Sequence, residues 1–179
     1  MSRRSGDGRL QMSVEEQVEA DFCRARRRAF VRQVRVRLRT DGVSDGLLCF
    51  DDLRKIPGAS AQVYRGIRTV PVGQIGGSIG RCSEFDRDFL PAKANVKEKW
   101  KHIDRAFHRG EKLPPVSLYK VGGFYFVLDG HHSVSVAYFH GVEWIDADVT
   151  EFRTGLWSDR RDNINELEPS KEGASGLHG

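Results

Sequence analysis

Residues 124–133 read FYFVLDGHHS and join an unbroken apolar run to an acid, a glycine and two histidines. A short apolar run bounded by turn residues is typical of a buried strand in the middle of a sheet. Asp129-Gly130 ends this strand, and the residues from Ser133 to His140 predict a helix that stops at Gly141. The segment therefore predicts a buried strand, a tight turn and a helix start in direct succession.

The segments on either side extend this unit into a small mixed sheet with packed helices, an α+β fold. Val116–Val121 predicts a strand that reaches the next one through the hairpin turn Gly122-Gly123. Ile145–Phe152 alternates apolar and polar residues, as a strand with one wet face does. Ile67–Val72 predicts a strand at a sheet edge, because Pro71 has no backbone N–H to donate to a neighbour.

Two further helices are expected outside this unit. Ser13 and Glu16 form a capping-box pattern, which predicts a helix running to the turn before Gly42. An alternation of apolar residues and arginines over 34–39 leaves a strand open for the end of that segment. A second helix is expected from Asn95 to Gly110, with its apolar residues facing the core: Val96, Trp100, Ile103 and Phe107.

Two connecting segments carry weaker patterns. Phe50–Lys55 predicts a short helical turn closed by Pro57-Gly58. Residues 73–81 are rich in glycine and are expected to form a flexible loop, since the Lys-Ser/Thr ending of a P-loop and the spacing of a dinucleotide-binding turn are both missing.

Length and composition describe one ordinary domain with extensions. The chain has 179 residues, of which 39% are hydrophobic and 30% charged, which excludes collagen, coiled coil and wholesale disorder. We expect a disordered N-terminus at 1–12, a basic helical extension at 13–60, the main domain at 61–156 and a disordered tail at 157–179. The tail is expected because it holds almost no large apolar residue that could offset the cost of ordering it.

The chain lacks the patterns of export and membrane insertion. No stretch approaches the roughly 18 unbroken apolar residues of a membrane helix, and residues 1–10 are polar, so we expect a cytoplasmic protein without membrane contact. Cys23, Cys49 and Cys82 are odd in number and widely spaced. They are expected to be unpaired thiols rather than a disulfide framework or a zinc knuckle.

Positive charge is concentrated at the N-terminal end. Residues 1–39 hold 11 basic and 5 acidic side chains, whereas the remainder of the chain is net negative by two. Eight arginines lie between Arg24 and Arg39 with no acid among them. This segment predicts non-specific contact with a nucleic-acid backbone, although arginine stems that cover apolar surface on a solvated helix explain the same pattern. No aromatic residues interleave for base stacking.

The strand-turn-helix at 124–133 has the features of an anion site. The first N–H groups of a helix are unpaired and its N-terminus is partly positive, so Gly130, His131, His132 and Ser133 are the candidate phosphate contacts. Arg81 is a further candidate, delivered by the glycine-rich segment. Alternatively, Asp-Gly is an ordinary turn and the histidines are merely solvated. A zinc site from the histidine pair needs two more donors that nothing here nominates, so no metal site is expected.

Several segments together resemble the ParB/sulfiredoxin-like superfamily. They are VPVGQI (70–75), LPPV (113–116), LYKV (118–121), GFYFVLDGHH (123–132), Ala137 and GV (141–142). The resemblance spans residues 67–152 and implies a nucleotide (CTP, ATP or ADP, with Mg²⁺) or another phosphate ligand at the turn. It implies a phosphate-binding protein associated with DNA or with regulation.

The same resemblance limits which of the superfamily's activities are expected for this chain. ParB carries Gly-Glu-Arg-Arg where this chain has Gly130-His131-His132-Ser133, so the arginine pair tied to CTP hydrolysis and DNA clamping is missing. Sulfiredoxin needs a cysteine where His131 stands, which excludes sulfinic acid reduction. The turn is similar to that of the ADP-dependent serine kinase. The enzymatic alternatives are therefore a small-molecule kinase or a ParB-like nuclease, with Asp129 as base or metal ligand and His132 as electrostatic support.

Overall fold

A computed structural model describes residues 12–38, 47–50 and 61–153, and within them the expected α+β fold is confirmed. The helices are α1 (Val14–Arg37), α3 (Lys97–His108) and α4 (His131–His140), with short 3-10 turns at Val72–Gln74 and Ala94–Val96. The strands are β1 (Leu48–Cys49), β2 (Ala61–Pro71), β3 (Ile75–Ser78), β4 (Val116–Val121), β5 (Phe124–Asp129) and β6 (Trp144–Arg153). The expected disordered ends (1–12 and 157–179) and helical turn (50–55) lie almost entirely outside the described residues.

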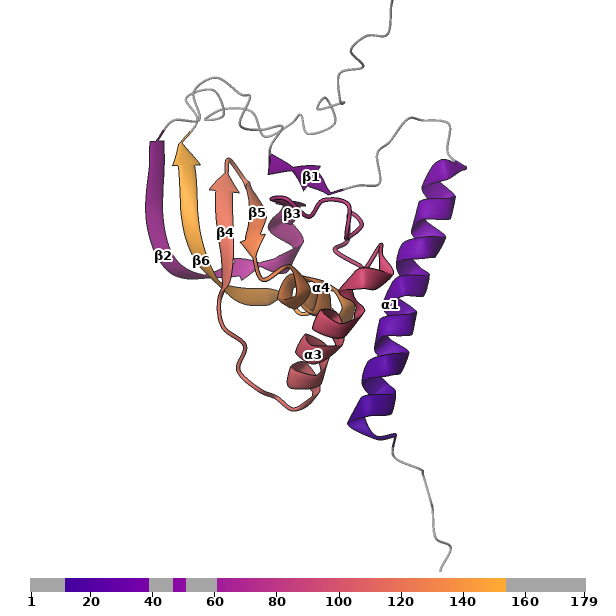
Figure 1. The fold of residues 1–179 in the computed structure, drawn as a ribbon. Helices are drawn as coiled ribbons and strands as arrows, with labels where there is room; N and C mark the ends of the chain where they lie inside the picture. The colour runs from indigo at the N-terminus through magenta and orange to yellow at the C-terminus, as the bar shows by residue number, and fades with distance from the viewer. Residues whose placement is uncertain (1–11, 39–46, 51–60, 154–179) are drawn as a thin grey trace, which may run out of the picture.

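The strands form one mixed sheet in the order β1-β3-β5-β4-β6-β2. The β4–β5 pair is the expected antiparallel hairpin, whereas β5 runs parallel to β3 and β4 runs parallel to β6. β5 lies inside the sheet and β2, which ends at Pro71, lies at its edge, as the sequence predicts. Helices α4, α3 and α1 succeed one another beside the sheet, with α1 outermost (Figure 1).

The main core lies between these helices and the sheet. Trp100 of α3 is fully buried, and its indole Nε1 donates a hydrogen bond of 2.9 Å to Ser135 Oγ of α4. A smaller aromatic cluster lies apart from it and contains Phe50, Phe126 and Phe152. The helical layer is therefore held to the sheet by apolar burial and locked internally by a buried hydrogen bond.

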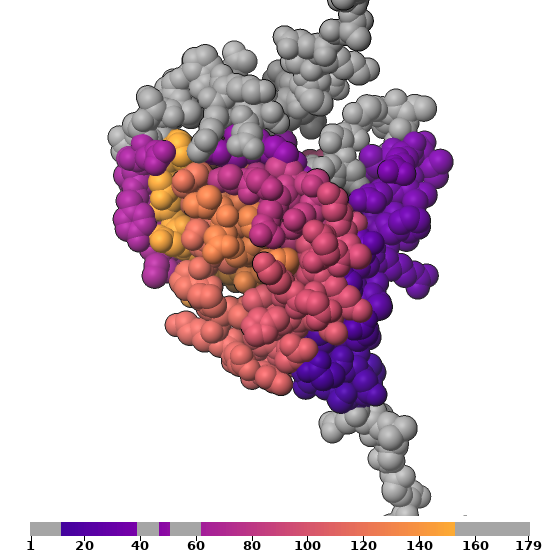
Figure 2. All heavy atoms as spheres, in the orientation of Figure 1, coloured from indigo at the N-terminus to yellow at the C-terminus, as the bar shows by residue number. Residues whose placement is uncertain are grey.

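Helix α1 extends through the segment for which the sequence left a strand open. The capping box forms, since Glu16 N donates to Ser13 Oγ at 3.3 Å and Ser13 N donates to the Glu16 carboxylate at 2.8 Å. The helix continues through Val34 and Val36 to Arg37, so the strand alternative is wrong there. Phe22, Ala25 and Ala29 of α1 belong to the main core. α1 packs along the body and is not a free arm (Figure 2).

The expected flexible loop at 73–81 is wrong over residues 75–78, which form strand β3 between β1 and β5. The glycines serve close packing here. A Cβ on Gly77 would lie 2.2 Å from Phe126 Cδ1 and 2.8 Å from Leu48 O, so only glycine allows the neighbouring strands to approach this closely.

Two expectations about individual residues are also corrected. Cys49 and Cys82 form a disulfide with a Cα separation of 5.7 Å, because the pairing of β1 with β3 brings together residues 33 positions apart. Phe107, expected in the core, is 37% exposed at the end of α3. Across the described residues, no helix combines the length and apolarity needed to cross a membrane.

Candidate functional site

The turn between β5 and α4 is shaped by Gly130. Its φ is +89°, a left-handed conformation that favours glycine, and a Cβ there would lie 2.6 Å from Val116 Cγ1. Helix α4 begins directly after it at His131, two residues before the expected start at Ser133. No side chain caps this helix end, so its first N–H groups have no side-chain acceptor.

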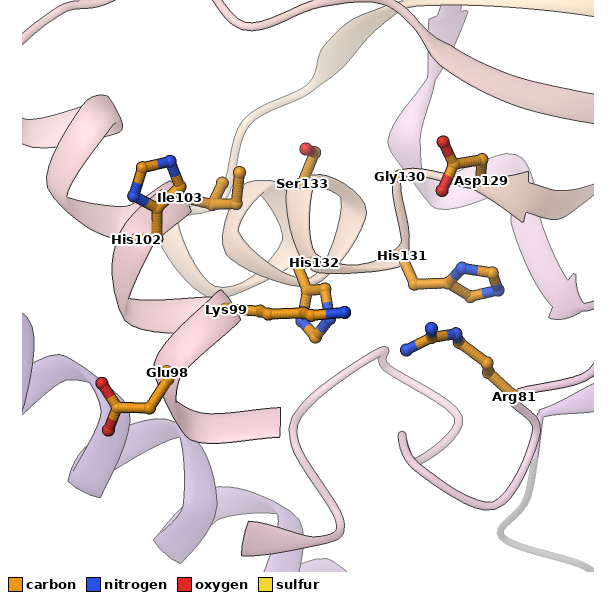
Figure 3. Close-up of a pocket in the computed structure, with 10 residues that line it drawn as sticks. All are labelled: Arg81, Glu98, Lys99, His102, Ile103, Asp129, Gly130, His131, His132 and Ser133. Carbon is orange, nitrogen blue, oxygen red and sulfur yellow. The ribbon is translucent and has the colours of Figure 1, made fainter. Parts of the chain in front are cut away.

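A cavity of about 490 Å³ opens at this uncapped end. Its size falls in the range of small-ligand sites. The lining comes from the segment after β3, from α3 and from the β5–α4 turn: Arg81, Glu98, Lys99, His102, Ile103, Asp129, Gly130, His131, His132 and Ser133 (Figure 3). All six candidate residues from the sequence, which are Arg81 and 129–133, therefore line one cavity.

The ring of His131 is turned into the protein. It is 4% exposed, its Nε2 lies 2.8 Å from the buried Ser78 Oγ, and it stacks on Phe85. Burial, with Arg81 and His132 nearby, lowers its pKa to about 4. His131 is therefore neutral at pH 7, and one ring nitrogen is already engaged. What His131 offers the cavity at the helix end is chiefly its backbone N–H.

His132 differs from its neighbour in having no hydrogen-bond partner. Both ring nitrogens are buried and unpaired among the described residues, and the ring meets the edge of Phe85. Burial, followed by the charges of Arg81 and Lys99, lowers its pKa to about 4. A buried imidazole without a partner carries a desolvation cost that a polar ligand could relieve.

Two cations face the cavity from separate elements. Figure 3 shows the Arg81 guanidinium directed toward the two imidazole rings and the Lys99 side chain extending across His132. Arg81 Nη1 lies 3.1 Å from the Glu84 carboxylate, whereas Lys99 forms no ion pair within the described part of the chain. Asp129 and Glu98 add carboxylates to the lining. Asp129, at the end of β5, is exposed and points to the other side of the turn from His132.

The contributions of α3 were missed by sequence reasoning. Lys99, His102 and Ile103 occupy one helix face at spacings of three and four residues, which is the only local pattern that links them. Nothing in the sequence relates that face to the turn after β5. Ser78, the partner of His131, was likewise hidden in the segment expected to be a loop.

The arginines of α1 divide into two groups. Arg24 pairs with Asp21 and Arg32 pairs with Asp88. Arg26 donates to the backbone oxygen of Pro91 at 3.1 Å, and Arg28 lies over the Phe139 ring. These stems and charges serve packing, as the alternative explanation of the segment predicts. A second group remains exposed along the helix: Arg27, Arg35 and Arg37. Arg39 lies outside the described residues.

Comparison with known proteins gives one loose likeness. No family model and no curated protein matches the chain. Among solved structures, the chain is similar to sulfiredoxin from Arabidopsis thaliana, with 18% identity, a TM-score of 0.36, and coverage of 50% of this chain and 85% of that one.

Proposed function

We propose that this protein binds a phosphate-bearing small molecule, specifically a nucleotide such as CTP, ATP or ADP, at the N-terminus of α4. The observation that carries the proposal is the convergence of Arg81 and Lys99 on an uncapped helix end inside one cavity. Unpaired backbone N–H groups, the helix dipole and two cations all favour an anion at the same place.

The two histidines take different parts in this site. His131 is held by Ser78 and supports the turn, whereas His132 has free ring nitrogens facing the cations. A phosphate oxygen beside His132 would favour the imidazolium form, because an adjacent negative charge raises the pKa of a histidine. Binding should therefore take up a proton between pH 4 and 6.5, the range between the folded-state pKa and the ordinary value.

The test is thermal unfolding of the full chain with ADP, ATP, CTP or inorganic phosphate, each with and without Mg²⁺. A nucleotide at about 100 times its dissociation constant should raise the melting temperature by roughly 5–10 °C. Phosphate alone should give a smaller shift, since it makes only the contacts at the helix end. Absence of any shift from all four compounds would contradict the proposal.

Charge-removing variants locate the site. Arg81→Gln and Lys99→Gln should each weaken nucleotide binding by about 10- to 100-fold, the cost of losing a hydrogen bond between charged groups. Arg68→Gln is the matched control, because Arg68 is exposed on the edge strand β2, three strands away from β5, which leads into the candidate turn. Equal binding by all three variants would place the nucleotide elsewhere.

A phosphotransferase is the second candidate, favoured by the exposed carboxylate of Asp129 at the cavity lining. Such a group can accept a proton from a hydroxyl substrate or hold Mg²⁺. Asp129→Asn separates the two functions: loss of phosphoryl transfer with nucleotide binding retained indicates the enzyme. A chain that binds nucleotide but transfers no phosphate to any hydroxyl compound, and cleaves no nucleic acid, is a binding protein.

Association with nucleic acid is a further part of the proposal, supported by the exposed arginines of α1. Binding through a phosphate backbone must weaken steeply as salt increases. Replacing Arg27, Arg35 and Arg37 by Gln should reduce both the affinity for duplex DNA and the slope of its salt dependence. Salt-independent binding would contradict an electrostatic contact.

A further inference from the structure

Four side chains that bind metals well meet where α1, α3 and α4 come together. They are Asp21 of α1, Asp104 and His108 of α3, and His140 at the last position of α4. One ligand atom from each lies within 4.8 Å of all the others. We propose that they form a site for one divalent transition-metal ion, specifically Zn²⁺, that fastens the basic helix α1 to the rest of the fold.

The distances suit a tetrahedral ion. His140 Nε2 lies 2.6 Å from Asp104 Oδ1, His108 Nε2 lies 2.8 Å from Asp21 Oδ2, and His108 Nε2 lies 3.6 Å from Asp104 Oδ2. Zinc bonds of about 2.0–2.1 Å imply ligand separations of about 3.3 Å. The two short pairs need to open by about 0.5 and 0.7 Å as zinc replaces the shared protons, and pairs near the 4.8 Å limit need to close by up to about 1.5 Å.

The burial of the two carboxylates is a second reason to infer a metal ion. Asp104 is wholly buried and Asp21 is 1% exposed, and Asp104 Oδ2 has no hydrogen-bond partner. A buried carboxylate oxygen without a partner is costly, and it is directed at the cluster, 3.6 Å from His108 Nε2. A metal ion bound through Oδ2 would satisfy this oxygen and offset the two carboxylate charges, with His140 Nε2 exchanging its contact with Asp104 Oδ1 for the ion.

Neighbouring groups hold the ligands in place. Arg24 pairs with Oδ1 of Asp21, which leaves Oδ2 of that carboxylate for the cluster. The His140 ring stacks on Phe107 with centroids 4.1 Å apart and an interplanar angle of 15°. Contacts of this kind fix the orientation of metal ligands in other proteins.

The donor set favours a transition-metal ion such as zinc over Mg²⁺ or Ca²⁺. Two imidazole nitrogens and two carboxylate oxygens suit zinc, whereas Mg²⁺ and Ca²⁺ prefer oxygen ligands throughout. With four protein ligands, the site is closed in the manner of a structural zinc centre. It lies at the opposite end of α4 from the uncapped turn, so it is independent of the nucleotide proposal, and either can fail alone.

The test is a zinc titration of the full chain after removal of metals with a chelator, using a chromophoric chelator as competitor. One equivalent of zinc should bind and raise the melting temperature. Cobalt(II) in its place should give the strong visible absorption of a four-coordinate ion. A change to a residue that only positions a metal ligand weakens metal binding by roughly 10- to 100-fold. His108→Gln and Asp104→Asn remove ligands themselves, so each should weaken zinc binding by more than that.

Asp146→Asn is the matched control, because Asp146 is an exposed carboxylate on β6 that accepts a hydrogen bond from Thr69 Oγ1. It should bind zinc as the unmodified chain does. Circular dichroism establishes that each variant is folded, and His108 is only partly buried, so its replacement is the milder one. The proposal would be overturned if the unmodified chain bound no zinc, or if His108→Gln and Asp104→Asn bound zinc as strongly as the unmodified chain does.

Discussion

Acid should destabilise the folded protein through the buried imidazole of His132. Its pKa is lowered from 6.5 to about 4, first by burial and then by the charges of Arg81 and Lys99. The folded state therefore binds fewer protons than the unfolded state between these two values. The contribution of His132 to the free energy of unfolding is therefore at its full value above pH 6.5, and it is lost as the pH falls through 6.5 toward 4.

The expected loss follows from the size of this shift. Linkage gives about 2 kcal/mol of stability lost between pH 7.5 and pH 5 for one such ring, approaching about 3 kcal/mol below pH 4. His131 has a similarly lowered pKa and adds a loss of the same sign. Replacing His131 would also break its hydrogen bond with Ser78, so His132 is the cleaner position to change.

The assay is urea denaturation at pH 7.5 and pH 5 for the unmodified chain and for His132→Leu, in buffers without phosphate. Leucine removes the titrating ring and leaves no unpaired polar atom. The difference in their free energies of unfolding then reports the titration of His132, together with the smaller effect of its charge on the pKa of His131. The variant should gain about 2 kcal/mol relative to the unmodified chain on going from pH 7.5 to pH 5.

Ile103→Leu is the control, because it changes the lining of the same cavity and leaves every titratable group in place; it should keep the pH dependence of the unmodified chain. If the unmodified chain and His132→Leu lose the same stability between the two pH values, the assignment of a buried, unpaired imidazole at this position is refuted.

Three substitutions test the packing by the same denaturation measurement at pH 7.5. Gly77→Ala should cost about 3 kcal/mol, because its Cβ would overlap the Phe126 ring, and a neutral effect would show that β3 does not pack there. Gly130→Ala should cost about 2–4 kcal/mol through the left-handed φ and the contact with Val116; unchanged stability would argue against this turn. Ser13→Ala should cost about 1 kcal/mol by removing the cap of α1, and no cost would mean the capping box does not form in solution.

Local patterns allowed most elements to be predicted. The hairpin at 122–123, the strand before Asp129 and the helix after it are each specified by residues a few positions apart. Ser13 and Glu16 predicted the start of α1 for the same reason, since a capping box is made within one helical turn. The candidate residues at 129–133 were found because one turn holds them together.

Expectations that depended on distant partners were the ones that needed correction. The glycine-rich segment became strand β3 because β1 and β5 lie on either side of it, and the disulfide between Cys49 and Cys82 follows from that pairing. Glycine marks a loop and a close approach between strands equally well, and the choice depends on neighbours far along the chain.

The sequence by itself determined the strand-turn-helix and the concentration of arginine in α1, because hydrogen bonds and periodicity within a few residues specify them. Only the tertiary structure brought Lys99 to that helix end, turned His131 onto Ser78, and gathered Asp21, Asp104, His108 and His140 into one cluster. Those arrangements depend on how α1, α3 and α4 pack against the sheet. Packing brings side chains together by shape and burial, and spacing along the chain does not record it.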